Sequence, residues 1–245
     1  VPTTNLIYLG YNSSRGALQE PGVRAALGAC IDKTALLSEA YHSYARPCAT
    51  PFPPGWYGVD EGDFEKPYDA AGARKALEDL GYTQLNNGVR GSRYRQLKFT
   101  LLVNADSPAK MAAARAVRVQ LGTYQIAVDV QALPEAQYLA MVRGGWFDMY
   151  IGEVRLTPDC SLAPLLLSGG AATGGVRVWG AASSAYGQLL QGLVPAAQFV
   201  GVFREEMPFL PLGYRDGMAA AARGLRVPQG VRRNDLFCKI DQWAF

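Results

Sequence analysis

The stretch PGVRAALGACIDKTAL, residues 21–36, decides the fold of this chain. Its apolar residues recur three and four positions apart, the spacing of one face of a helix. Pro21 suits the first turn of that helix. Asp32 can cap a second helix, because its carboxylate accepts amide hydrogens from the following turn. The stretch therefore predicts two consecutive helices that pack on a core.

A second stretch, YDAAGARKALEDLGY at residues 68–82, predicts another amphipathic helix. Asp69 is its expected N-cap, and Gly81 is its expected left-handed stop. Alternating apolar patterns elsewhere predict strands, at residues 5–12, 96–104, 126–130, 147–154 and 207–214. Helical patterns occupy the segments between them, at residues 107–121, 134–143, 183–193 and 196–206. This order predicts one α/β domain over residues 1–245, a mixed sheet flanked by helices.

In this order, the two motifs resemble the second lobe of family 5 solute-binding proteins, which feed peptides, and sometimes nickel, to ABC importers. The first family pattern, V-R-x-A-L-x-x-A-I-D-R, is matched by Val23, Arg24, Ala26, Leu27, Ile31, Asp32 and Lys33. The second, Y-D-x-x-x-A-x-x-L-L-x-x-x-G-Y, is matched by Tyr68, Asp69, Ala73, Leu77, Gly81 and Tyr82. Residues 114–154 and 206–212 are similar to later parts of the same family pattern.

The resemblance implies one lobe of a type II, periplasmic-binding-protein-like fold with two lobes. Residues 213–245 would return toward a first lobe that this chain lacks, and hinge crossings are expected near residues 8–12 and 212–215. The implied function is solute binding, with a peptide as the expected ligand, in a cleft between the lobes. The implied partners are the first lobe and an ABC permease. A monomer outside the cytoplasm is expected. It would lie in the periplasm, or on the outer face of the cell membrane through a lipid anchor beyond this segment.

The loop after the strand at 147–154 is the main candidate site, because ligands of α/β sheets bind beyond strand ends. Arg155 can pair with a ligand carboxylate, and Asp159 can accept a ligand ammonium. In the family, a Trp and an acidic residue three positions later mark this loop. Direct counting puts these positions on Val154 and Thr157, so Thr157 is a second candidate. The alternative for Asp159 is a turn-forming role after Pro158.

Aromatic residues supply further candidates, since aromatic rings suit peptide ligands as well as buried cores. Tyr57 lies in a loop that is rich in proline and glycine, at residues 46–58. Trp179 follows the Gly-rich segment at 168–175, which is either a binding loop or a plain surface loop. We expect both residues to meet the loop at 155–164 on one surface.

Composition excludes several other classes. The net charge is +3 and the basic residues are scattered, so no nucleic-acid partner is expected, and the turn near Arg90, Arg93 and Arg95 is expected to be a solvated hairpin. The four cysteines have no metal-ligand spacing, and we expect neither a metal nor a cofactor. Their redox state stays open: Cys30 and Cys48 form a disulfide, or all four are buried thiols.

An enzyme is the rival class. His42 is the only histidine, and no Gly-x-Ser-x-Gly elbow occurs, so no catalytic set is predicted. A small hydrolase-like α/β enzyme and a surface domain without a ligand remain the alternatives. The sequence leaves the ligand open among dipeptides, oligopeptides, nickel chelates and other solutes.

Overall fold

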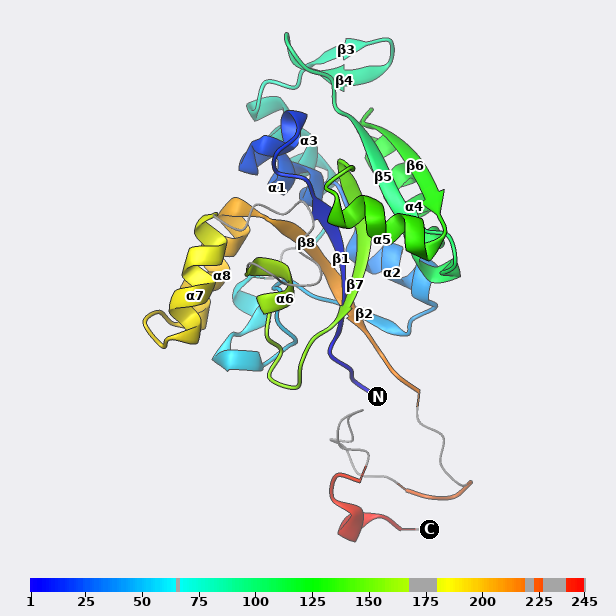
Figure 1. Cartoon of the computed structure of the whole chain (residues 1–245), viewed down its shortest axis with the longest axis vertical. Coiled ribbons are helices and arrows are strands. Elements are labelled where there is room, and N and C mark those ends of the chain that lie inside the picture. The colour runs from blue at the N-terminus through cyan, green and yellow to red at the C-terminus, as the bar shows by residue number, and fades with distance from the viewer. Residues whose placement is uncertain (65–66, 168–179, 219–222, 227–236, 245) are drawn as a thin grey trace.

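The centre of the molecule is a six-stranded mixed sheet, seen in a computed structural model that describes residues 1–64, 67–167, 180–218, 223–226 and 237–244 (Figure 1). Its strand order is β2-β8-β1-β7-β5-β6. Strand β1 is antiparallel to β7 and β8, whereas β5 is parallel to β6 and β7. The strands are β1 (Asn5–Tyr11), β2 (Ala45–Pro47), β5 (Lys98–Asn104), β6 (Ala127–Leu133), β7 (Met149–Arg155) and β8 (Phe209–Arg215). The predicted mixed sheet is confirmed.

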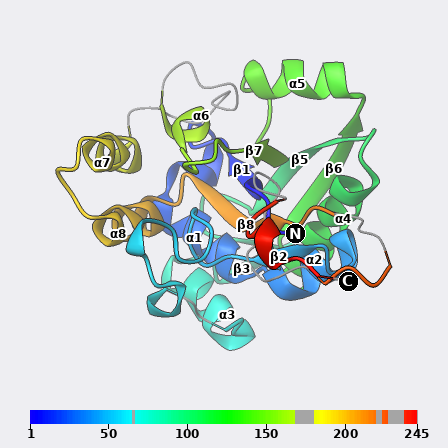
Figure 2. The same ribbon diagram turned by 90° about the horizontal axis from the view of Figure 1, so that it is seen from below.

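Helices cover both faces of this sheet and enclose two apolar cores (Figure 2). One core lies beneath α1 (Pro21–Ala29), α2 (Lys33–Tyr41), α3 (Ala70–Asp79) and α4 (Pro108–Gly122). The other lies beneath α5 (Glu135–Arg143), α6 (Ala163–Leu166), α7 (Ala181–Leu190) and α8 (Ala196–Glu206). A separate hairpin joins β3 (Gln84–Asn86) to β4 (Val89–Gly91). Single 3-10 turns are η1 (Gly16–Gln19), η2 (Trp56–Gly58), η3 (Glu61–Asp63) and η4 (Ile240–Gln242).

The local signals that predicted the helices act as expected. Pro21 stands in the first turn of α1. The Asp32 carboxylate accepts a hydrogen bond from the Ala35 amide at 3.0 Å and caps α2. Asp69 caps α3 in the same way, through the Ala71 amide at 3.0 Å. Gly81 has a φ of 82°, the left-handed conformation that ends the helix.

Two tyrosines lie across glycines of the neighbouring strand at the centre of the sheet. Tyr8 pairs with Gly152 and Tyr150 pairs with Gly10, so each ring covers a position without a side chain. A Cβ on either glycine would lie 2.2 Å from the opposing ring. The rings meet edge to face at 5.6 Å, and their hydroxyls lie 3.3 Å apart. This close approach fixes the β1–β7 register.

Antiparallel pairing brings the start of β1 beside the ends of β7 and β8, because Asn5 pairs with both Arg155 and Arg215. The pairing continues outward, since the Leu156 amide donates to the Thr4 carbonyl at 3.0 Å. We call this end of the sheet the basal edge. The two segments where hinge crossings are expected, residues 8–12 and 212–215, therefore do not lie together, because Arg215 pairs with Asn5 and Tyr11 lies at the opposite end of β1.

The structure also decides the redox state of the cysteines and corrects the expectation for Arg90. Cys30 and Cys48 belong to different cores on opposite faces of the sheet, and all four cysteines are thiols, so this disulfide is absent. Arg90 was expected in a solvated hairpin, but it is buried, and its guanidinium donates to the carbonyls of Tyr82 and Tyr124. Glu206, at the end of α8, also joins two helices, because its carboxylate accepts the Ala182 amide in the first turn of α7.

Candidate functional site

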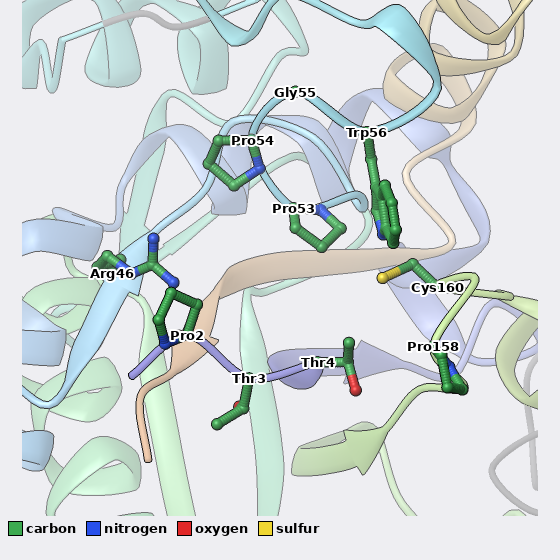
Figure 3. Close-up of a pocket in the computed structure, with 10 residues that line it drawn as sticks. All are labelled: Pro2, Thr3, Thr4, Arg46, Pro53, Pro54, Gly55, Trp56, Pro158 and Cys160. Carbon is green, nitrogen blue, oxygen red and sulfur yellow. The ribbon is translucent and has the colours of Figure 1, made fainter. Parts of the chain in front are cut away.

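A hollow of about 330 Å³ opens at the basal edge (Figure 3). One wall is the loop that carries two prolines and Trp56, and the floor is the segment just before β1. The turn after β7 closes the third side, and the Trp56 ring points toward Cys160. The lining is mostly apolar and consists of Pro2, Thr3, Thr4, Arg46, Pro53, Pro54, Gly55, Trp56, Pro158 and Cys160.

The predicted site residues Tyr57 and Asp159 meet beside this hollow. The Tyr57 hydroxyl donates to the Asp159 carbonyl at 2.8 Å, which ties the proline-rich loop to the turn after β7. That turn is closed by a hydrogen bond of 2.8 Å from the Cys160 amide to the Thr157 carbonyl, with Pro158 at its second position. Asp159 thus occupies a turn, as the alternative interpretation held.

The turn does not use the Asp159 carboxylate. Among the described residues this side chain makes no hydrogen bond and no ion pair, and Asp159 and Thr157 are both exposed. Arg155, the last residue of β7, is likewise exposed and outside every ion pair of the described residues. One carboxylate and one guanidinium at the basal edge are therefore available to a ligand.

Two buried polar atoms at the basal edge lack a hydrogen-bond partner among the described residues. They are the indole nitrogen of Trp56, a donor, and the side-chain oxygen of Asn5, an acceptor. Buried polar groups are normally paired, so such orphans call for an explanation.

Neighbouring groups set the charge state around the hollow. Burial raises the pKa of the Tyr57 hydroxyl, and Tyr186 and Asp159 raise it further, so Tyr57 stays neutral near pH 7. Arg46 is paired with Asp216, with its Nε 3.2 Å from both carboxylate oxygens. Arg46 is exposed, so this ion pair contributes little to the stability of the fold.

Two other aromatic residues of β7 and the segment before it lie away from this hollow. Tyr150 is fully buried in the core under α5, and Trp146 is exposed at the other end of β7. Trp179 and the segment 168–175 lie outside the described residues, which stop at Leu167 and resume at Gly180. Sequence analysis missed Pro2, Thr3 and Thr4, because nothing in their residue types signals a site; only strand pairing brings them to the hollow.

His42, the only histidine, ends α2 in a left-handed conformation and is exposed. In the described ranges no group of three or more His, Cys, Asp or Glu side chains is placed to hold a metal ion. None of the described helices combines the length and the apolar character needed to cross a membrane.

The family model for the middle part of bacterial extracellular solute-binding proteins, family 5, matches residues 1–170. The chain belongs to this family. Its members are binding proteins rather than enzymes.

The relatives of this chain are named for several different ligands. Residues of this chain are 25% identical over 169 positions to heme-binding protein A of Haemophilus influenzae, covering 66% of this chain and 29% of that protein. They are 30% identical over 138 positions to the glutathione-binding protein GsiB of Pectobacterium atrosepticum, covering 56% and 24%. The chain thus spans less than a third of the length of these relatives.

Solved structures agree with the fold. NikA from Brucella suis, in complex with Fe(III)-EDTA, superposes with a TM-score of 0.72 at 22% identity, over 87% of this chain and 45% of that one. The oligopeptide-binding protein AppA from Bacillus subtilis, in complex with a nonapeptide, gives a TM-score of 0.71 at 18% identity, over 88% and 45%. At these identities the likeness establishes the type II solute-binding fold alone.

Proposed function

We propose that this chain is one lobe of a solute-binding protein for an ABC importer, and that it forms one wall of a ligand cleft at the basal edge. Family membership supports the solute-binding role. The observation that carries the proposal is the meeting of the turn at 157–160, the loop around Tyr57 and the start of β1 at one edge.

The same edge suits a junction between lobes. Asn5 and Arg215 are paired, so two polypeptide segments can leave the lobe side by side there. The Val1 carbonyl also accepts from the Gly217 amide at 2.7 Å, which continues this pairing toward the junction. Hinge closure about such a junction would bring the second wall over the hollow and exclude water.

The proposed ligand is a peptide. Its ammonium would bind the Asp159 carboxylate, and its carboxylate would bind Arg155 in the two-point geometry that guanidinium favours. A backbone carbonyl of the peptide would accept from the Trp56 indole, and apolar side chains would lie on the prolines of the hollow. Heme, glutathione and chelated metal, which relatives or neighbours carry in their names, are the competing ligands.

Ligand identity is tested by native mass spectrometry of the full-length protein, followed by titration calorimetry with the ligand found. Asp159→Asn should weaken peptide binding about ten- to a hundredfold, the value of a charge-assisted hydrogen bond in a closed cleft. It should leave the melting temperature unchanged, because the turn uses only the Asp159 backbone. Thr157→Ala tests the second candidate position in the same turn: weaker peptide binding in this variant, with unchanged binding in Asp159→Asn, would assign the ligand contact to Thr157. Unchanged affinity in Asp159→Asn would place the ammonium contact elsewhere.

We further propose an extracytoplasmic monomer that delivers its ligand to a membrane permease and performs no covalent chemistry. The last point is supported by His42, the only histidine, which is exposed at the end of α2 and makes no side-chain hydrogen bond or ion pair with the described residues. Ester or peptide hydrolysis that disappears in His42→Ala would contradict it.

A further inference from the structure

A second hollow, of about 260 Å³, lies at the end of the sheet opposite the basal edge. Its walls include Arg15, which follows β1, Arg95 and Lys98 before and at the start of β5, and Asp148 before β7. Strand β1 has seven residues and so separates this end from the basal edge by about 20 Å. We call this end the apical edge; the β3–β4 hairpin projects beside it at the top of Figure 1.

Positive charge at the apical edge is only partly neutralised. Arg95 lies 3.4 Å from Glu20, and Arg15 lies 4.0 Å from Asp148. The second Asp148 oxygen accepts the Thr100 amide at 2.8 Å, so this carboxylate is already shared. Lys98 and Arg93 are exposed, and neither is in an ion pair with any described residue.

An aromatic ring accompanies these cations. Tyr94 is 82% exposed, and the Arg93 guanidinium lies 5.4 Å from its ring centre. Tyrosine and arginine are enriched at protein interfaces, whereas lysine is depleted there. An exposed tyrosine beside an arginine is therefore typical of an interface. A concave hollow lined by Arg15, Arg95 and Lys98 fits a protruding acidic side chain better than it fits a flat lipid surface.

The turn that carries these residues is firmly anchored. Below it, the buried Arg90 guanidinium donates to the Tyr124 and Tyr82 carbonyls, both at 2.9 Å. The Ser92 amide donates to the Arg95 carbonyl at 2.8 Å and closes the turn. The charged groups are therefore presented by a rigid support, which lowers the entropic cost of binding a partner.

We propose that the apical edge docks an acidic segment of the membrane permease, a proposal that rests on the proposed transport function. Rotation about a junction at the basal edge displaces the apical edge further than any point near the hinge. A partner that binds there would thus distinguish the closed, loaded protein from the open one. Charge complementarity would also speed the encounter and make it sensitive to salt.

The test measures binding of the full-length protein to permease in nanodiscs, and ligand binding separately by calorimetry. Arg93→Glu and Lys98→Glu, made singly, should each weaken docking at least about tenfold and leave ligand affinity and the melting temperature unchanged. Arg115→Glu is the matched control, since Arg115 is exposed on α4 and the change in net charge is the same. Its docking should stay within about twofold of the wild type.

Docking that is equal in all three variants would overturn the proposal. So would weakened binding of Lys98→Glu to phosphatidylglycerol vesicles without permease, if permease docking stayed intact, because the apical edge would then serve a lipid surface. Failure of the wild type to bind any solute would instead contradict the proposed function, and the docking measurement would still report on the apical edge.

Discussion

Arg24 joins two helices and a turn through one buried side chain. Its guanidinium donates to the carbonyls of Leu18 at 2.6 Å and Met207 at 3.0 Å, and also to the Glu206 carbonyl. These acceptors include the end of α8, where the helix dipole favours a positive charge. Burial lowers the pKa of Arg24, and Glu206 opposes that shift, so the side chain stays charged at neutral pH. The sequence motif named this arginine, but two of the carbonyls that it binds, those of Glu206 and Met207, lie 182 and 183 residues away and could not be predicted.

Arg24→Met should therefore destabilise the fold by about 3 kcal/mol, because it leaves several buried carbonyls without a donor. Arg115→Met, at an exposed position on α4, is the control and should change stability by less than about 0.5 kcal/mol. Urea unfolding followed by circular dichroism measures both. Equal midpoints for the two variants would show that the Arg24 hydrogen bonds do not hold α8.

The cysteines differ sharply in exposure. Burial raises the pKa of the Cys30 thiol from 9.0 to about 12, and Cys48 and Cys160 are also buried. A thiol reagent at pH 8 should therefore label Cys238 alone in the folded protein, and all four cysteines after unfolding. Two labelled cysteines after unfolding would instead indicate a disulfide.

The raised pKa of Cys30 also predicts a pH dependence of stability. Because the fold favours the protonated thiol, the contribution of Cys30 to stability is full below pH 9 and is lost between pH 9 and 12. Cys30→Ala should reduce this alkaline loss.

At the scale of elements, local sequence signals were sufficient to predict where helices begin and end, but they did not predict how strands and helices pair. Caps at Asp32 and Asp69 and the stop at Gly81 follow from chemistry within one helical turn, so the sequence predicts them. Tyr8 packs over Gly152 because of the register between β1 and β7. The two residues are 144 positions apart in sequence, so no local pattern encodes this pairing. Likewise, Glu206 caps α7 from the end of the following helix, a contact that only packing creates.

Gly152→Ala should destabilise the protein by about 1–3 kcal/mol, because the new methyl group would overlap the Tyr8 ring. Gly187→Ala, in α7, is a control, since a Cβ there meets no atom within 4 Å and alanine favours a helix. Thermal melts should place the first variant below the wild type and the second at or above it. If Tyr8→Ala restored the stability of Gly152→Ala only partly, the remaining loss would reflect the Tyr8 side chain itself.

At the scale of the whole molecule, strand direction determines where function can lie. The sequence predicted that the loop at 155–164 and Tyr57 share one surface, and the hydrogen bond from Tyr57 to the Asp159 carbonyl joins them; their role in binding stays a prediction. It did not show that residues 8–12 and 212–215 lie apart, because sequence order does not reveal which end of β1 meets Arg215. The same sheet separates Cys30 from Cys48, although they are close in sequence. Long-range pairing, not residue type, decides these features.

The central claim is that ligand binds this lobe at the basal edge. Hydrogen–deuterium exchange of the full-length protein, with and without its copurified ligand, tests this most directly. We predict that ligand slows exchange most at the amides of residues 156–160 and 55–59, which flank the hollow. The apical residues 92–98 should be unchanged in the absence of permease. Protection confined to the apical residues, or absent from this lobe while the other lobe is protected, would contradict the account.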